Sequence, residues 1–138
     1  MDFPAQCIRG LRVQQWIRQD GKLRTDAYRP NRSEKAQRPD GLFAASINWD
    51  DDANAVPFTL TQPSAQFGHA TVRRSNLDEI REDPGAKGVL QYERDELPDN
   101  RYHGNILFDK DTPKPVETFI AGKLAQLSKV FQRSSIAI

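Results

Sequence analysis

A stripe of apolar residues near the C-terminus constrains the fold more than any other feature of this sequence. Its members recur at three- and four-residue steps, and they are Val116, Phe119, Ile120, Leu124, Leu127, Val130 and Phe131. This spacing predicts an amphipathic helix of about four turns, whose first turn accommodates Pro113 or Pro115. Burial of such a stripe contributes on the order of 10 kcal/mol before entropy, so we expect the helix to cover a sheet.

The strands of that sheet are expected in short apolar runs that precede the helix. The candidate strands are residues 42–49, 67–72, 89–93 and 102–108. A hairpin is also expected within residues 8–28, because the glycine of Asp20-Gly21 accepts the positive φ of a tight turn.

Serine and proline residues set the remaining boundaries. Ser75 suits the N-cap of a short helix, which Pro84-Gly85 would stop. Pro57 and Pro63 predict irregular structure over residues 53–66. Together the elements predict an α+β fold: a small, mostly antiparallel sheet covered by one main C-terminal amphipathic helix, plus a short helix.

A chain of 138 residues is expected to form a single domain, residues 1–138. A long polar surface loop is expected at residues 29–40, which contain no large apolar residue. Loops of this kind are commonly functional or disordered. The loop is therefore predicted to contact a partner through its four basic side chains, Arg29, Arg32, Lys35 and Arg38.

Charge is unevenly distributed along a chain whose formal net charge is only +1. Residues 1–40 hold nine basic and five acidic groups, residues 41–100 hold five and eleven, and residues 101–138 hold six and three. The basic ends either fold against the acidic middle or face an acidic partner. The near-neutral total excludes a histone-like tail or a uniformly basic nucleic-acid coat.

The sequence favours a cytoplasmic location with no membrane partner. No stretch approaches the roughly 18 apolar residues of a membrane span, and the acid and proline at Asp2 and Pro4 do not suit a signal peptide. Cys7 is the only cysteine, so neither an intrachain disulfide nor a cysteine-based zinc site is expected. We predict no cofactor.

Two histidines are the candidate catalytic pair. His69 and His103 both fall in candidate strands, and if those strands are neighbours their imidazoles could divide general-base and general-acid work. Arg73 shares a strand face with His69 and Thr71, so Arg73 could hold a phosphate and Thr71 could orient it. The alternative is that both histidines simply pack at a sheet surface. His69-Ala70-Thr71 also resembles half of the signature of two-histidine phosphoesterases, but Asn105 departs from the second half.

An acidic cluster begins like a calcium-binding loop. Asp50, Asp52 and Asn54 have the right spacing, but Ala55 stands where the loop needs glycine and Thr61 where it needs glutamate. A calcium loop is therefore rejected, and we predict no metal site. A solvated cluster at a strand end is favoured over a Mg²⁺ site.

Two features bear on nucleic-acid binding. Gly85-Ala86-Lys87-Gly88 has the GxxG form that clamps phosphates in one RNA-binding fold, but the preceding Pro84 favours a plain turn. The basic residues near Trp16 and Tyr28 could contact phosphates and stack on bases. Nucleic acid is thus the less favoured class of partner.

Four short motifs carry a family resemblance: Asp20-Gly21, Ala27-Tyr28, Ala45-Ser46-Ile47 and His103-Gly104-Asn105-Ile106. Their order resembles a set of small uncharacterised bacterial proteins with no assigned activity. Gly104 departs from that pattern, where alanine is expected. The resemblance implies a bacterial accessory protein, encoded beside a larger partner.

The sequence holds no P-loop, GxGxxG or GxSxG motif. It therefore favours a small accessory protein that acts in a complex with a larger protein partner. The alternative is a small, metal-independent phosphoester or RNA hydrolase that uses the histidine pair. The second alternative is an RNA-binding module.

Overall fold

The computed structural model describes residues 3–30, 38–109 and 111–133. Within these ranges, six strands form one sheet in the order β4-β5-β2-β1-β3-β6, and all neighbouring strands are antiparallel. The strands are β1 (Gln6–Gly10), β2 (Leu42–Trp49), β3 (Gly68–Arg73), β4 (Gln91–Arg94), β5 (His103–Asp109) and β6 (Lys129–Gln132). The sheet confirms the strand part of the predicted fold.

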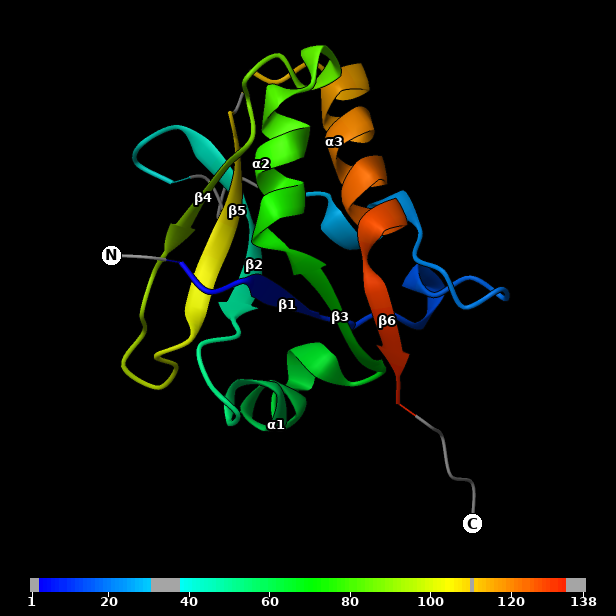
Figure 1. Ribbon diagram of the computed structural model, residues 1–138, viewed down its shortest axis with the longest axis vertical. Coiled ribbons are helices and arrows are strands. Elements are labelled where there is room, and N and C mark those ends of the chain that lie inside the picture. The colour runs from blue at the N-terminus through cyan, green and yellow to red at the C-terminus, as the bar shows by residue number, and fades with distance from the viewer. Residues whose placement is uncertain (1–2, 31–37, 110, 134–138) are drawn as a thin grey trace.

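Helices α2 (Arg74–Glu82) and α3 (Lys114–Leu127) lie side by side over one face of the sheet (Figure 1). Helix α1 (Ala55–Leu60) contacts β1, β2 and β3. It packs through Ala55 against Ile8 and Tyr102 on the opposite face. Short 3₁₀ turns complete the described part: η1 (Gln14–Trp16), η2 (Thr25–Tyr28), η4 (Pro63–Ala65) and η5 (Pro84–Ala86). The predicted α+β class and the main C-terminal helix are confirmed.

Apolar and polar side chains alternate along β2, so one face of this strand packs in the core and the other face is polar. Ala45, Ile47 and Trp49 are buried in the main hydrophobic core beneath α2 and α3, whereas Ser46 is exposed. Successive strand residues point to opposite faces, so Ser46 and Asn48 lie on the face away from those two helices. Helix α3 adds Val116, Ile120, Ala121, Leu124 and Ala125 to the core.

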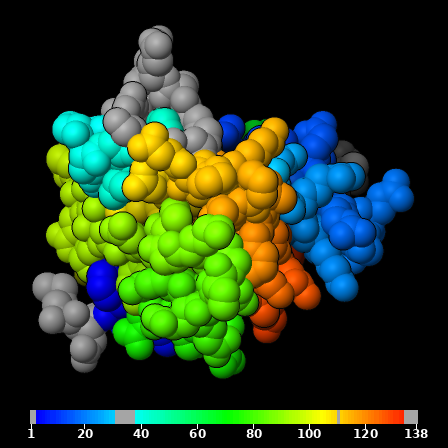
Figure 2. Space-filling view, turned by 90° about the horizontal axis from the view of Figure 1, so that it is seen from above, coloured from blue at the N-terminus to red at the C-terminus, as the bar shows by residue number. Residues whose placement is uncertain are grey.

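The segment that carries η1 and η2 stands beside α3, as Figure 2 shows from above. It is anchored by Tyr28, which is fully buried and whose hydroxyl lies 2.6 Å from the Ser128 hydroxyl. The segment follows β1 in the chain, and the Arg9 side chain of β1 donates to its Ala27 carbonyl at 2.9 Å.

The C-terminal stripe divides between two elements, which corrects the predicted extent of the helix. Helix α3 ends at Leu127, and Ser128 adopts an extended backbone while its hydroxyl donates to the Leu124 carbonyl. Val130 and Phe131 then pair with β3 as part of β6. The edge of β3 offers backbone partners to this segment, and this tertiary pairing overrides the helical period of the sequence.

The predicted hairpin over residues 8–28 was wrong in extent. Gly21 does adopt a positive φ of 83° within a tight turn, but only one isolated bridge, Ile17 with Leu23, joins the flanking segments. The apolar residues at 7 and 8 belong instead to β1, which pairs with β2 and β3.

Two further boundaries differ from expectation. Residues 53–66 are not irregular, because α1 contains Pro57 in its first turn, where the missing N–H costs no helical bond. Helix α2 begins at Arg74 with Arg73 at its N-cap, so Ser75 lies inside the helix and does not cap it.

A close approach of neighbouring atoms requires glycine at position 104, where the resemblance had led us to expect alanine. A Cβ at this position would overlap the Trp49 indole nitrogen and the Glu93 carbonyl oxygen. The same indole N–H donates to that carbonyl at 3.0 Å. Glycine therefore leaves room for the Trp49 indole to reach the Glu93 carbonyl past β5.

Some basic residues of the two end segments form ion pairs with acidic residues of the middle segment. Arg38, from the basic first segment, pairs with Glu93 of the acidic middle, and Arg101 pairs with Asp52. These contacts show the basic ends folding against the acidic middle, which is the explanation that requires no partner.

Candidate anion-binding site

A pocket of about 750 Å³ lies where β1 and β2 separate. Strands β1 and β2 are paired only at Cys7↔Trp49 and Ile8↔Asn48, whereas β1 continues along β3 as far as Gly10. Beyond Ile8 the two strands therefore diverge, and the pocket occupies the space between them. Its walls come from β1, β2, the η1–η2 segment, the α1–η4 segment and the start of β5.

Glycine at position 10 allows one wall to close. A Cβ there would lie 2.5 Å from the Ser64 carbonyl oxygen, which is closer than real Cβ contacts permit. The backbone of η4 therefore lies directly over the end of β1. This approach brings Gln62 and Ser64 to the rim of the pocket.

Arg9 bridges the gap between the separated strands. Its Nε donates to the Ala27 carbonyl at 2.9 Å, and its Nη1 donates to the Ser46 carbonyl at 2.6 Å. Desolvation lowers the pKa of this guanidinium to about 10, so Arg9 remains protonated near pH 7. Among the described residues, no carboxylate neutralises it.

Arg12 adds a second positive charge beside the first. The guanidinium carbons of Arg9 and Arg12 lie 5.2 Å and 5.1 Å from the centre of the Trp16 ring. The charge of Arg12 also contributes to lowering the pKa of Arg9. Within the described chain, Arg12 makes no ion pair, so two cations share one indole without a compensating acid.

Arg29 and Asp26, which also line the pocket, neutralise each other. The Arg29 Nε lies 3.1 Å from the Asp26 carboxylate, and its Nη1 lies 2.7 Å from Glu117. The described lining thus holds three arginines and one aspartate. Among the described lining residues, the positive charge that no carboxylate compensates is that of Arg9 and Arg12.

His103 lines the pocket from the first residue of β5. Its Nδ1 lies 2.9 Å from the Asp95 carbonyl oxygen and 3.5 Å from the Asp95 carboxylate. A carbonyl oxygen only accepts, so Nδ1 carries the proton of this bond. In the neutral ring, Nε2 is then the acceptor that is left for the pocket.

The predicted histidine pair is not brought together. Strands β3 and β5 are separated by β2 and β1, which places them about 14 Å apart at the usual strand spacing. Both histidines lie on the same face, since His103 pairs with Asn48, Asn48 with Ile8, and Ile8 with Thr71, two residues from His69. Helix α1 packs on Ile8, in the middle of that row.

His69 has a different environment from His103. Its ring stacks on Phe131 at 4.7 Å, burial lowers its pKa, and its Nδ1 is buried without a hydrogen bond in the described structure. Thr71 is buried beside it, and Arg73 is exposed at the end of β3. These contacts favour the structural interpretation of His69.

Two of the predicted partner-binding residues, Arg32 and Lys35, lie outside the described residues. Arg29 and Arg38 are held by intramolecular ion pairs. Arg38 meets both Glu93 oxygens, and this hydrogen bonding raises the pKa of Arg38 and lowers that of Glu93. These two guanidiniums are thus fixed against the protein's own acids.

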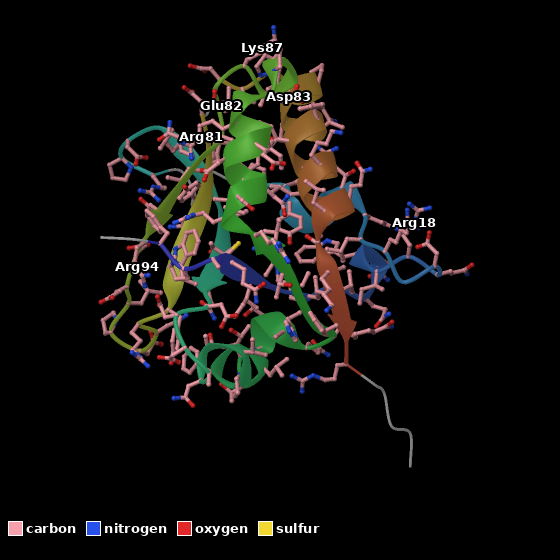
Figure 3. All side chains as sticks on the ribbon, in the orientation of Figure 1. Arg18, Arg81, Glu82, Asp83, Lys87 and Arg94 are labelled. Atoms are coloured by element: carbon pink, nitrogen blue, oxygen red, sulfur yellow. The ribbon has the colours of Figure 1, made fainter. Side chains whose placement is uncertain are left out.

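The acidic cluster and the GxxG segment also have structural roles. Asp51 forms two bonds with Arg94, and Asp52 accepts from Arg101 and Tyr102. No group of three or more potential metal ligands occurs within the described ranges. Lys87 lies at the tip of the turn after α2, at the top of Figure 3, with a φ of 50°.

Ser46 was not predicted as a site residue. Arg9, Arg12 and Trp16 were considered only as part of the basic first segment that could bind nucleic acid. The available signal was Arg9 itself, a cation placed within the apolar run that extends from Cys7 to Leu11.

No helix in the described ranges is long and apolar enough to cross a membrane. The sequence matches no family model, and no match was found among curated proteins or solved structures.

Proposed function

We propose that this protein is a binding domain for a small anionic molecule that carries phosphate groups. The observation that carries the proposal is the pair Arg9 and Arg12, two cations at one pocket without a carboxylate partner among the described residues. An unpaired, partly desolvated charge is costly. A bound anion would offset that cost.

The chemistry of the lining favours phosphate over a simple halide. Guanidinium groups present planar sets of N–H donors that match phosphate oxygens. Two of the N–H bonds of Arg9 are used by carbonyls, which fix its orientation and leave further donors. The cavity of about 750 Å³ falls within the usual range for small-molecule sites, roughly 300–1,000 Å³.

A binding role fits the predicted accessory protein better than the two-histidine hydrolase, because His69 and His103 stand on strands that are not neighbours. Action in a complex with a larger partner stays a prediction. A pocket that recognises a phosphorylated ligand would let such a complex respond to that ligand.

Calorimetric titration of the full chain with inorganic pyrophosphate tests the proposal. The variant is Arg12→Gln, because Arg12 is exposed and its loss breaks no hydrogen bond in the described structure. The matched control is Arg18→Gln. Arg18 lies in the same basic segment but points away from the sheet in Figure 3 and pairs with Asp20.

Saturable binding is expected for the wild type and for Arg18→Gln. Loss of one phosphate-binding cation should weaken Arg12→Gln by about tenfold, which corresponds to about 1.4 kcal/mol. Absence of saturable pyrophosphate binding, or equal weakening in both variants, would contradict the proposal.

A further inference from the structure

Ser46 and His103 are diagonal neighbours on the polar face of the sheet. Ser46 pairs with Asn105 and Asn48 pairs with His103 across β2 and β5. Such diagonal positions lie about 7–8 Å apart, and their Cβ atoms lie somewhat closer. An aromatic ring such as the His103 imidazole can span a distance of this size. Both residues line the pocket that holds Arg9 and Arg12.

Ser46 has the features of an accessible nucleophile. It is exposed, and its hydroxyl makes no hydrogen bond within the part of the chain that the structure describes. Its own carbonyl accepts from Arg9 at 2.6 Å. The Arg9 guanidinium is therefore fixed against the Ser46 backbone and lines the same pocket. There it would offset negative charge that develops during attack on an ester.

His103 has the features of an oriented base. The bond from Nδ1 to the Asp95 carbonyl fixes its tautomer, and the Asp95 carboxylate lies close enough to stabilise an imidazolium. Asn105 holds that carboxylate, since its Nδ2 donates to Asp95 at 3.3 Å and to Glu93 at 2.7 Å. A hydroxyl, an imidazole and a carboxylate therefore follow one another along one face.

We propose that Ser46 and His103 hydrolyse a phosphate ester bound in this pocket. The Ser46 Oγ attacks phosphorus while its proton passes to Nε2 of His103. A bond forms between Oγ and phosphorus, the ester P–O bond breaks, and the leaving oxygen takes the proton from His103. Water then gives a proton to Nε2 and displaces Ser46, which recovers its proton as the phosphate is released.

This inference rests on the proposed anion-binding function and adds the substrate class, a phosphate ester. Arg9 and Arg12 would offset the charge on the non-bridging oxygens. Asp95 and Asn105 are positioning residues in this scheme. His69 has no part in it, so it provides a matched control.

The first test uses a fluorophosphonate probe on the full chain, followed by peptide mass spectrometry. We expect labelling at Ser46, slowed by about tenfold or more in His103→Gln, because general-base catalysis contributes about 10²–10⁴-fold. His69→Gln and Ser75→Ala should label at the wild-type rate. No label at Ser46, or a rate that His103→Gln leaves unchanged, would overturn the inference.

A second measurement does not depend on a variant that folds. Saturating pyrophosphate should protect Ser46 of the wild-type protein from the probe, and the same protein should release nitrophenolate from bis(p-nitrophenyl) phosphate. If pyrophosphate does not protect Ser46 and no nitrophenolate is released, the proposed hydrolysis by Ser46 and His103 is overturned. Calorimetric pyrophosphate binding without labelling would refute only the hydrolase, whereas labelling without pyrophosphate binding would refute the proposed anion specificity.

Discussion

Replacement of Arg9 by methionine has two opposing effects on the free energy of unfolding: it removes hydrogen bonds, and it removes a desolvated charge. The change keeps an unbranched apolar stem but removes the donors to the Ala27 and Ser46 carbonyls. Each unsatisfied buried carbonyl costs about 1–3 kcal/mol, which gives a loss of about 2–6 kcal/mol. The carbonyl beside the exposed Ser46 can accept from water, so the lower half of that range applies.

The same substitution also removes a desolvated charge. Burial lowers the pKa of Arg9 from 12.5 to about 10, and at 1.36 kcal/mol per unit this corresponds to about 3 kcal/mol of relief. The two effects nearly cancel. We therefore expect Arg9→Met to change the free energy of unfolding by no more than about 1 kcal/mol in either direction, well below the roughly 3–5 kcal/mol of a broken buried ion pair.

Urea denaturation with and without pyrophosphate measures both parts of this prediction. A ligand at 100 times its Kd stabilises the native state by about 2.7 kcal/mol. Wild-type protein should gain this amount, and Arg9→Met should gain almost none. If Arg9→Met lowers the free energy of unfolding by more than about 4 kcal/mol without ligand, the two effects do not cancel. If pyrophosphate stabilises Arg9→Met as much as the wild type, Arg9 does not belong to the site.

Two further changes test the packing and the ion pairs. Gly104→Ala should lower the free energy of unfolding by about 1–3 kcal/mol in urea, because the new Cβ overlaps fixed backbone and indole atoms; unchanged stability would contradict this account. Arg38 lowers the pKa of Glu93, so their pair stabilises the protein above the ordinary glutamate pKa and this contribution is lost as the pH falls through the lowered value. In Glu93→Gln the free energy of unfolding should therefore lack this loss at low pH. Identical curves of unfolding free energy against pH for the variant and the wild type would show that the Arg38–Glu93 pair does not cause the loss.

The sequence predicted those elements whose periodicity matches their final packing. Strand β2 was expected at residues 42–49 and runs from Leu42 to Trp49, because one of its faces is apolar and is buried under α2 and α3. Val130 and Phe131 were assigned to the helix because their spacing also continues its stripe. Only the exposed edge of β3, a tertiary feature, places them in β6.

The site was less predictable because it depends on the order of strands in the sheet. His69 and His103 lie in strands of the expected kind, but local sequence does not reveal that β2 and β1 stand between them. For the same reason the proximity of Ser46 and His103 follows only from the register of β2 with β5. Arg9 becomes notable only once β1 is seen to leave β2 after Ile8.

The short junction between β1 and β2 has a mechanical consequence. Two residue pairs join one half-sheet, β4-β5-β2, to the other, β1-β3-β6, whereas β2 and β5 share seven. Twisting between the halves is therefore resisted at Cys7 and Ile8, at the Arg9 bridge and at the two hydrogen bonds between Gln6 and Asp50. A ligand that touches Arg9 on one half and Ser46 on the other would lock this joint, and amide exchange across it would slow when the pocket is filled.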